Sequence, residues 1–259
     1  MPRTAAPERD FLLGKLRVRV YENVTSLSEA AADDVARAMV DALAAKAELN
    51  LVLSGAESQE VFLQSLAGHR EIDWARVNYF AVDEFYAPGM ALDMAVSVQP
   101  IRILSGLSLK SLNVLDPHAR SIVAERRRYE ELIRLHRPDV ACLGIGRSGH
   151  IAFNEPGQCD LRGSEDVRII AVDDDSIAQL RDDPNFQRLG EIPSRAMTVT
   201  LPFLMSCPVI SVVVPFAAKA PVIRRLVDST DVSADFPATV LKEQESAVLY
   251  LDRESYGLC

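Results

Sequence analysis

Short apolar runs alternate along the chain with longer stretches in which apolar residues recur every three or four positions. Residues 49–55 (LNLVLSG), 139–146 (DVACLGIG) and 209–215 (VISVVVP) are almost continuously apolar. Such runs are typical of strands that are buried on both faces of a sheet. Four further ranges have the composition or alternation of strands: 16–21, 77–85, 167–172 and 247–252.

Helical periodicity fills the intervals between these runs. We expect helices over about 28–47, over 58–66, over 120–136 and from about Ala217 onward. Ser26 and Glu29 have the spacing of a capping box ahead of the first helix. Because strands and helices alternate throughout, residues 1–259 are expected to form one three-layer α/β/α domain with a mostly parallel sheet. The polar segment 157–190, with its acidic runs, is expected to be mobile and to act as a lid.

Composition narrows the class of protein. The 259-residue chain carries a net charge of −9, which argues against a nucleic-acid surface, because phosphate backbones need clustered Lys and Arg. No apolar run is long enough to span a membrane, and the N-terminus lacks the apolar core of a leader peptide. The four cysteines show no metal-ligand spacing, and Cys142 is expected in the core. These features indicate a reduced, cytoplasmic protein without a metal site.

Three chemically rich stretches follow predicted strands, where ligands of parallel α/β sheets bind. The first, SGAES, contains Ser54, Gly55, Ala56 and Ser58. A glycine turn between a strand and a helix presents N–H groups that suit an anion such as phosphate. A plain tight turn with a serine N-cap is the commoner explanation of such a stretch by itself.

The second and third stretches carry acid–base groups. Asp83 and Glu84 are neighbours in a strand, so their side chains point to opposite sides and one of them could serve as a general base. A solvated acid pair is the alternative. In GHIAFNEPG, His150 lies in a glycine-rich loop, where an imidazole can shuttle protons and Glu155 can orient it. The alternative is a histidine hydrogen-bonded in the core.

Two cations complete the candidate site. Arg181 lies in the expected lid, and Lys219 follows the buried strand 209–215 at the start of a helix. Either side chain could hold a phosphate group. A surface cation is the commoner explanation of each when it is taken alone.

The order of these stretches resembles one known family. SGAES, VDEFY, CLGIGRSGHIAFNEPG, IPSRAMTVTLPFLMSC and VVVPFAAKAPVIRRLV follow one another as in the glucosamine-6-phosphate deaminases (isomerases), over roughly residues 27–252. GHIAFNEPG resembles the deaminase signature most specifically, whereas the related 6-phosphogluconolactonases differ after the Gly-His pair. The resemblance implies a modified Rossmann-like three-layer α/β/α sandwich.

The resemblance also implies a reaction and its residues. Glucosamine 6-phosphate and water would become fructose 6-phosphate and ammonia, without a cofactor or metal. Asp83 would be the general base that moves a proton between C2 and C1. His150 would help to open the sugar ring, with Glu155 as its carboxylate partner. The phosphate would bind to the SGAES loop and to the cations Arg181 and Lys219.

The chain departs from the family pattern at three places. Ser148 stands where most deaminases carry Asp, and a hydroxyl supports an imidazolium less well than a carboxylate does. Glu57 resembles an insertion in the phosphate loop. Residues 86–99 are mostly apolar, with Ser97 as the only hydroxyl near. These departures affect the expected sugar and phosphate contacts more than the reaction class.

Three functions therefore fit the sequence. The first is an amino-sugar phosphate deaminase, and the second is a lactonase or another phosphosugar isomerase on the same scaffold. The third is a non-catalytic sugar-phosphate sensor. In each of them the expected partner is a small phosphosugar rather than nucleic acid or a membrane, and homo-oligomers are possible.

Overall fold

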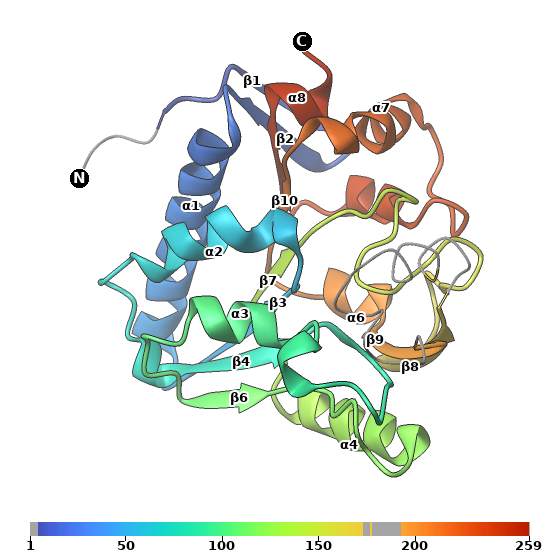
Figure 1. The fold of residues 1–259 in the computed structure, drawn as a ribbon. Coiled ribbons are helices and arrows are strands. Elements are labelled where there is room, and N and C mark those ends of the chain that lie inside the picture. The colour runs from blue at the N-terminus through green and yellow to red at the C-terminus, as the bar shows by residue number, and fades with distance from the viewer. Residues whose placement is uncertain (1–4, 173–176, 178–192, 259) are drawn as a thin grey trace.

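The main sheet determines where the strand ends meet. The computed structural model describes residues 5–172, 177 and 193–258, and among these residues it forms an eight-stranded sheet in the order β1-β2-β11-β10-β7-β3-β4-β6 (Figure 1). Only β1 and β2 pair antiparallel, and the other pairings are parallel. The strands are β1 (Arg9–Leu13), β2 (Leu16–Tyr21), β3 (Leu49–Leu53), β4 (Val77–Ala81), β6 (Ser111–Asn113), β7 (Val140–Leu143), β10 (Val209–Val214) and β11 (Ala247–Asp252).

A second, antiparallel sheet corrects the expectation of one strand over residues 77–85. The chain leaves the main sheet after β4, and β5 (Asp83–Phe85) pairs with β9 (Arg195–Val199), which also pairs with β8 (Val167–Ala171). Val199 N donates to Val82 O at 2.8 Å, which closes the corner between the sheets. The sequence could not show this split, because both halves of 77–85 are buried and apolar or β-prone.

Helices cover both faces of the main sheet, which confirms the three-layer α/β/α class. Figure 1 shows α1 and α2 together on one side of the sheet, and α4 and α6 on the other. Each face has its own buried apolar cluster. The helices are α1 (Val24–Ala45), α2 (Glu60–Ala67), α3 (Val98–Ile103), α4 (Ile122–Leu135), α6 (Leu201–Met205), α7 (Ala220–Asp228) and α8 (Arg253–Tyr256). Short 3-10 turns are η1 (Glu57–Gln59), η2 (Trp74–Arg76), η3 (Leu92–Met94), η5 (Ala217–Lys219) and η6 (Pro237–Glu243).

The start of α1 differs from the expectation. Asn23 is the N-cap, and its side chain accepts a hydrogen bond from Ser26 N at 3.0 Å. The capping box of Ser26 and Glu29 was therefore wrong, since both residues already lie inside the helix. Asn competes well for an N-cap position because its short side chain reaches the free N–H groups of the first turn.

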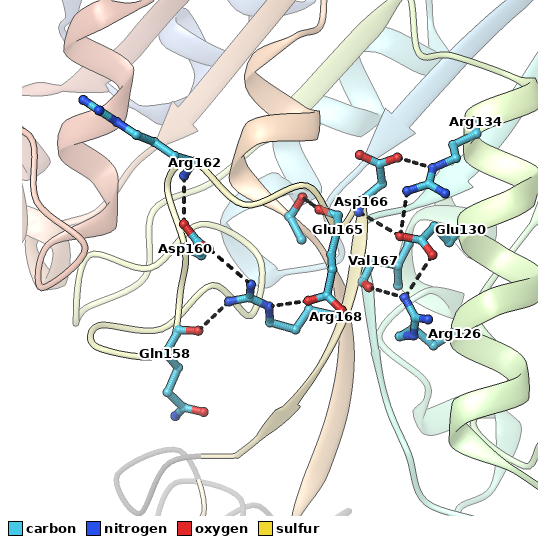
Figure 2. A network of polar contacts seen from close by, with 11 residues as sticks. Arg126, Glu130, Arg134, Gln158, Asp160, Arg162, Glu165, Asp166, Val167 and Arg168 are labelled. Carbon is cyan, nitrogen blue, oxygen red and sulfur yellow. Dashed lines mark hydrogen bonds and ion pairs between the residues drawn. The ribbon is translucent and has the colours of Figure 1, made fainter.

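The segment after Gly157 is tied to α4 by a polar network (Figure 2). Glu130 of α4 accepts hydrogen bonds from Arg126 at 2.9 Å and from Arg134 at 3.1 Å. The same carboxylate accepts Asp166 N at 2.9 Å. Residues 173–176 and 178–190 of the expected lid lie outside the described residues, so the lid stays a prediction.

Three further sequence expectations concern the whole molecule. Cys142 is buried in β7 as a free thiol, as expected. No helix among the residues placed in the structure is long and apolar enough to cross a membrane. Within the same residues, no group of three or more His, Cys, Asp or Glu side chains could hold a metal ion.

Candidate active site

The loops after three neighbouring strands meet at the carboxyl edge of the main sheet. Ser54, which follows β3, donates its N–H to Cys142 O of β7 at 3.0 Å. Gln59, buried in η1, donates to Ser58 Oγ at 3.2 Å and to Val213 O of β10 at 3.0 Å. Lys219 Nζ donates to Ile145 O, after β7, at 2.8 Å. The structure thus brings the SGAES loop, the loop of His150 and Lys219 together, as the parallel sheet predicts.

His150 takes part in a short chain of polar contacts. Its Nδ1 lies 2.9 Å from Ser148 Oγ and 2.6 Å from Glu155 Oε1. Ser148 Oγ donates to Glu155 Oε2 at 2.9 Å. The hydroxyl of Ser148 has one proton, which it donates to Glu155. Toward His150 it can therefore only accept a hydrogen bond, and this requires a proton on Nδ1. Nε2 is then the imidazole nitrogen that is left for a ligand.

Gly146 makes room for the imidazole. A Cβ atom at this position would lie 2.0 Å from His150 Nε2, far inside van der Waals contact. Gly146 N also donates to His150 O at 2.9 Å, so the loop closes on itself. This close approach is the physical reason for a glycine in the glycine-rich loop of His150.

The motif loop is fixed to β9. Asn154, buried at 4% exposure, donates to Val199 O at 2.9 Å, and Phe153 N donates to Thr198 Oγ1 at 3.1 Å. Thr198 is in turn the register partner of Asp83 in β5. One strand therefore supports both the loop of His150 and the strand of Asp83, and the amide of Asn154 has a structural task.

Asp83 is the buried acid of this site. The residue as a whole is 7% exposed. Burial raises the pKa of Asp83 well above its ordinary value, and the charges of Glu84 and Glu155 raise it further. The electrostatic influence of Glu155 shows that the two predicted catalytic segments lie close together. A raised pKa suits a carboxylate that must bind and release a proton near neutral pH.

Glu84 serves a different purpose from its neighbour. The side chain is 0% exposed and accepts hydrogen bonds from Phe85 N, Val96 N and Ser97 N, each at 3.0 Å, and from Ser97 Oγ at 2.7 Å. Its oxygens are therefore saturated by the protein. The hydroxyl of Ser97, which the sequence left as the only one near the sugar, donates its proton to Glu84.

The cationic side of the site includes a residue that the sequence reasoning missed. Burial lowers the pKa of Lys219, and the charge of Arg147 lowers it further, so these two cations lie near each other. Arg147 is exposed and sits between Gly146 and Ser148 in the motif loop. Its position beside the motif histidine was the signal that could have identified it. Arg181, the other predicted cation, lies outside the described residues.

Comparisons with known proteins agree with this arrangement. Residues 22–250 match the model of the family described as glucosamine-6-phosphate isomerases/6-phosphogluconolactonase. Glucosamine-6-phosphate deaminase 1 of Bacillus subtilis is 32% identical over 142 residues, which are 54% of this chain and 56% of the relative. The deaminase of Streptococcus suis is 27% identical over 184 residues, 71% of this chain and 76% of the relative. The chain thus spans a little over half the length of the Bacillus relative.

Solved structures support the fold. A monomeric glucosamine-6-phosphate deaminase superposes with a TM-score of 0.79 at 23% identity, covering 93% of this chain and 99% of that one. A 6-phosphogluconolactonase from Plasmodium vivax superposes with a TM-score of 0.74 at 16% identity, covering 95% and 93%. Together with the family match, which covers most of the sequence, these similarities confirm the resemblance seen in the motifs. The chain belongs to the family of glucosamine-6-phosphate isomerases and 6-phosphogluconolactonases.

Proposed function

We propose that this protein is an enzyme that converts glucosamine 6-phosphate and water to fructose 6-phosphate and ammonia. The observation that carries the proposal is the pairing of two separate proton-transfer groups on one support. His150, with its Nδ1 proton directed by Ser148 and Glu155, and the buried Asp83 are both fixed to β9. An aldose–ketose isomerisation needs such a pair, one group at the ring oxygen and one at the carbon atoms.

The roles follow from the geometry. Nε2 of His150 accepts the proton of the anomeric hydroxyl and returns it to the ring oxygen, which opens the ring. The negative charge of Glu155, 2.6 Å from Nδ1, stabilises the imidazolium that forms in between. Asp83 then removes the proton from C2 and delivers it to C1, while O1 takes up a proton that the C2 nitrogen gives up, so that C1 becomes a hydroxymethyl carbon and C2 an imine. Water adds to the resulting C2 imine, and ammonia leaves.

The phosphate group provides binding energy away from the reacting carbons. The SGAES loop, with Ser54 and Ser58, and the cation Lys219 surround the same edge of the sheet, with Arg147 beside them. Anchoring the substrate there orients C1 and C2 toward the acid–base groups. Arg181 remains part of the proposal on the strength of the family pattern alone. The reaction as proposed uses no cofactor or metal.

The charge of the site favours an amino sugar over a lactone. Asp83 feels the negative charges of Glu84 and Glu155, and these carboxylates come from two different segments. A substrate with an ammonium group at C2 would compensate this charge and lower the pKa of Asp83, so that the base becomes ionised when the substrate binds. A neutral lactone would bring no such compensation.

The test is proton NMR of glucosamine 6-phosphate with the purified protein in D₂O, with ammonia assayed in parallel. We expect fructose 6-phosphate and ammonia to appear together, and neither to appear with Asp83→Asn. Turnover of 6-phosphogluconolactone or of another phosphosugar without ammonia would replace the proposal by the related reaction. A ligand-induced rise in melting temperature without any turnover would indicate a sensor.

The proposal includes a location and leaves the assembly as a prediction. A cytoplasmic enzyme fits the three free thiols among the described residues, Cys142, Cys159 and Cys207. Homo-oligomers stay a prediction that sedimentation of the purified chain would test.

A further inference from the structure

Glu84 is buried next to the proposed base, and none of its hydrogen-bond partners among the described residues is a cation. Its four hydrogen bonds come from three main-chain N–H groups and one hydroxyl. Burial raises the pKa of Glu84, and the hydrogen bonds from Ser97, Val96 and Phe85 offset this only in part. A carboxylate in such surroundings lowers the stability of the folded state, and an apolar or neutral side chain could fill the same space without that cost. A role in the site would explain why a carboxylate is present.

The bonds of Glu84 hold a segment that touches the proposed phosphate loop. Val96 and Ser97 belong to the apolar stretch 86–99, where this chain departs from its family. The carbonyl oxygen of Val96 packs so tightly on Gly55 that a Cβ there would lie 2.1 Å from it. The hydroxyl of Tyr79, which is fully buried in β4, donates to Ser97 O at 3.1 Å and so ties the segment to the main sheet.

We propose that Glu84 is a positioning residue: its buried carboxylate ties the Val96–Ser97 segment to β5 and so sets the distance between the Gly55 loop and Asp83. The inference rests on the proposed function and adds a residue to it. Oε1 binds Val96 N, and Oε2 binds Ser97 N and Oγ, so both atoms are used. The phosphate end and the base end of the site are thereby joined through one side chain.

The same placement makes Glu84 an electrostatic neighbour of Asp83. Among the described residues, the titratable groups that interact with Asp83 are Glu84 of β5, Glu155 of the motif loop, Tyr79 of β4 and Tyr129 of α4. Both tyrosines have raised pKa values, chiefly through burial, and stay neutral in the working range. Removal of the charge of Glu84 should therefore lower the pKa of Asp83, and no purely structural role predicts that shift.

The experiment compares three variants. Glu84→Gln keeps the size but turns one oxygen into an N–H₂ group, which opposes at least one of the main-chain donors. Ser97→Ala removes only the hydroxyl bond. Glu130→Gln is the matched control, because Glu130 is also a buried glutamate that accepts a main-chain N–H but lies on α4 in the network of Figure 2.

The first readout is the dissociation constant of inorganic phosphate, measured by calorimetry. We expect Glu84→Gln to weaken phosphate binding about tenfold, which corresponds to the loss of one strong hydrogen bond. Ser97→Ala should weaken it less, and Glu130→Gln should bind like the wild type. Unchanged binding in Glu84→Gln would overturn the proposal, as would equal weakening in Glu130→Gln or a wild type that does not bind phosphate.

The second readout is the pH profile of kcat/KM for glucosamine 6-phosphate. The acid limb should move to lower pH in Glu84→Gln and stay in place in Ser97→Ala and Glu130→Gln. An unmoved limb in Glu84→Gln would count against the inference. If the wild type releases no ammonia while the phosphate affinities still follow the expected order, the proposed function fails and the positioning role of Glu84 stands.

Discussion

Two buried glutamates of this protein are stabilised in opposite ways. Glu84, at 0% exposure, is held by neutral donors, whereas Glu130, at 8%, accepts hydrogen bonds from two arginines and one main-chain N–H. Burial alone would raise the pKa of both carboxyls. At Glu130 the bond from Asp166 N and the charges of Arg126 and Arg134 outweigh burial, so its pKa is lowered. At Glu84 burial prevails, and its pKa is raised.

The difference separates a structural network from a functional one. The charges around Glu130 are balanced, so ionisation of this carboxyl favours the folded state. Among the described residues, burial prevails at both Glu84 and Asp83 and raises their pKa values, so ionisation there opposes folding. Uncompensated charge of this kind is typical of active sites, where a bound ligand supplies the opposite charge.

The largest expected effect is at Asp83. Its folded pKa is raised, so its contribution to stability is complete below the unfolded pKa and is lost as the pH rises through the folded pKa. Asp83→Asn should therefore lower ammonia release by about 10²–10⁴-fold and also raise the free energy of unfolding at pH 7 by about 0.5–2 kcal/mol. Steady-state kinetics and chemical denaturation measure both. A variant less stable than the wild type would show that the charge of Asp83 does not oppose folding.

The next effect concerns the space for the imidazole. Gly146→Ala places a Cβ within 2.0 Å of His150 Nε2, so the ring must move. We expect kcat to fall about 100-fold, because a displacement of about 1 Å in a catalytic group has this consequence. Phosphate binding should change less than kcat, since the loop of Gly55 is not disturbed. Wild-type kcat would show that His150 does not act at the position seen here.

A smaller effect is expected at Ser148. Ser148→Ala removes the hydroxyl that accepts from His150 Nδ1 and donates to Glu155. Glu155 Oε1 still lies 2.6 Å from Nδ1, so the orientation of the ring is only partly lost. We expect kcat to fall about fivefold, which corresponds to one hydrogen bond of about 1 kcal/mol. Ser148→Asp, measured in parallel, should raise kcat if a second charge supports the imidazolium, and a lower rate would show that the site is adapted to serine.

The smallest effect on activity is expected in the balanced network. Glu130→Gln should leave kcat/KM within about twofold but lower the free energy of unfolding by about 1–3 kcal/mol, because Arg126 and Arg134 lose the negative charge and one oxygen of their shared acceptor. The folded pKa of Glu130 is depressed, so its stabilisation is present above its ordinary value of 4.5 and is lost as the pH falls through the folded pKa. Denaturation between pH 3 and 7 should thus show that the free energy of unfolding falls less steeply with decreasing pH in the variant than in the wild type. An equally steep fall would show that Glu130 is not stabilised by its ionisation.

The sequence was most informative where burial leaves a simple pattern. The ends of the apolar strands β3, β7 and β10 were predicted to within three residues, because a strand covered on both faces tolerates few polar side chains. The positions of Asp83, His150 and Glu155 near one another also followed from the rule for strand ends and from the family motif.

Other features depend on contacts between distant segments and leave no local signal. The pairing of β5 with β9 and the bonds from Val96 and Ser97 to Glu84 join residues that only the tertiary structure brings together. Arg147 was overlooked because an exposed arginine has no pattern of its own. The start of α1 offers two capping signals, Asn23 and the pair Ser26 and Glu29. The helix is capped by Asn23, the one nearer the N-terminus.

The dependence on β9 has a consequence for the order in which the molecule folds. Asp83 and the loop of His150 precede Thr198 and Val199 in the chain, yet both are fixed by hydrogen bonds to that later strand. A growing chain on the ribosome therefore has both reactive groups long before it has the strand that aligns them. Non-local pairings of this kind form slowly. The protein should become catalytically competent only late in its synthesis, after the parallel strands that precede β9 have been made.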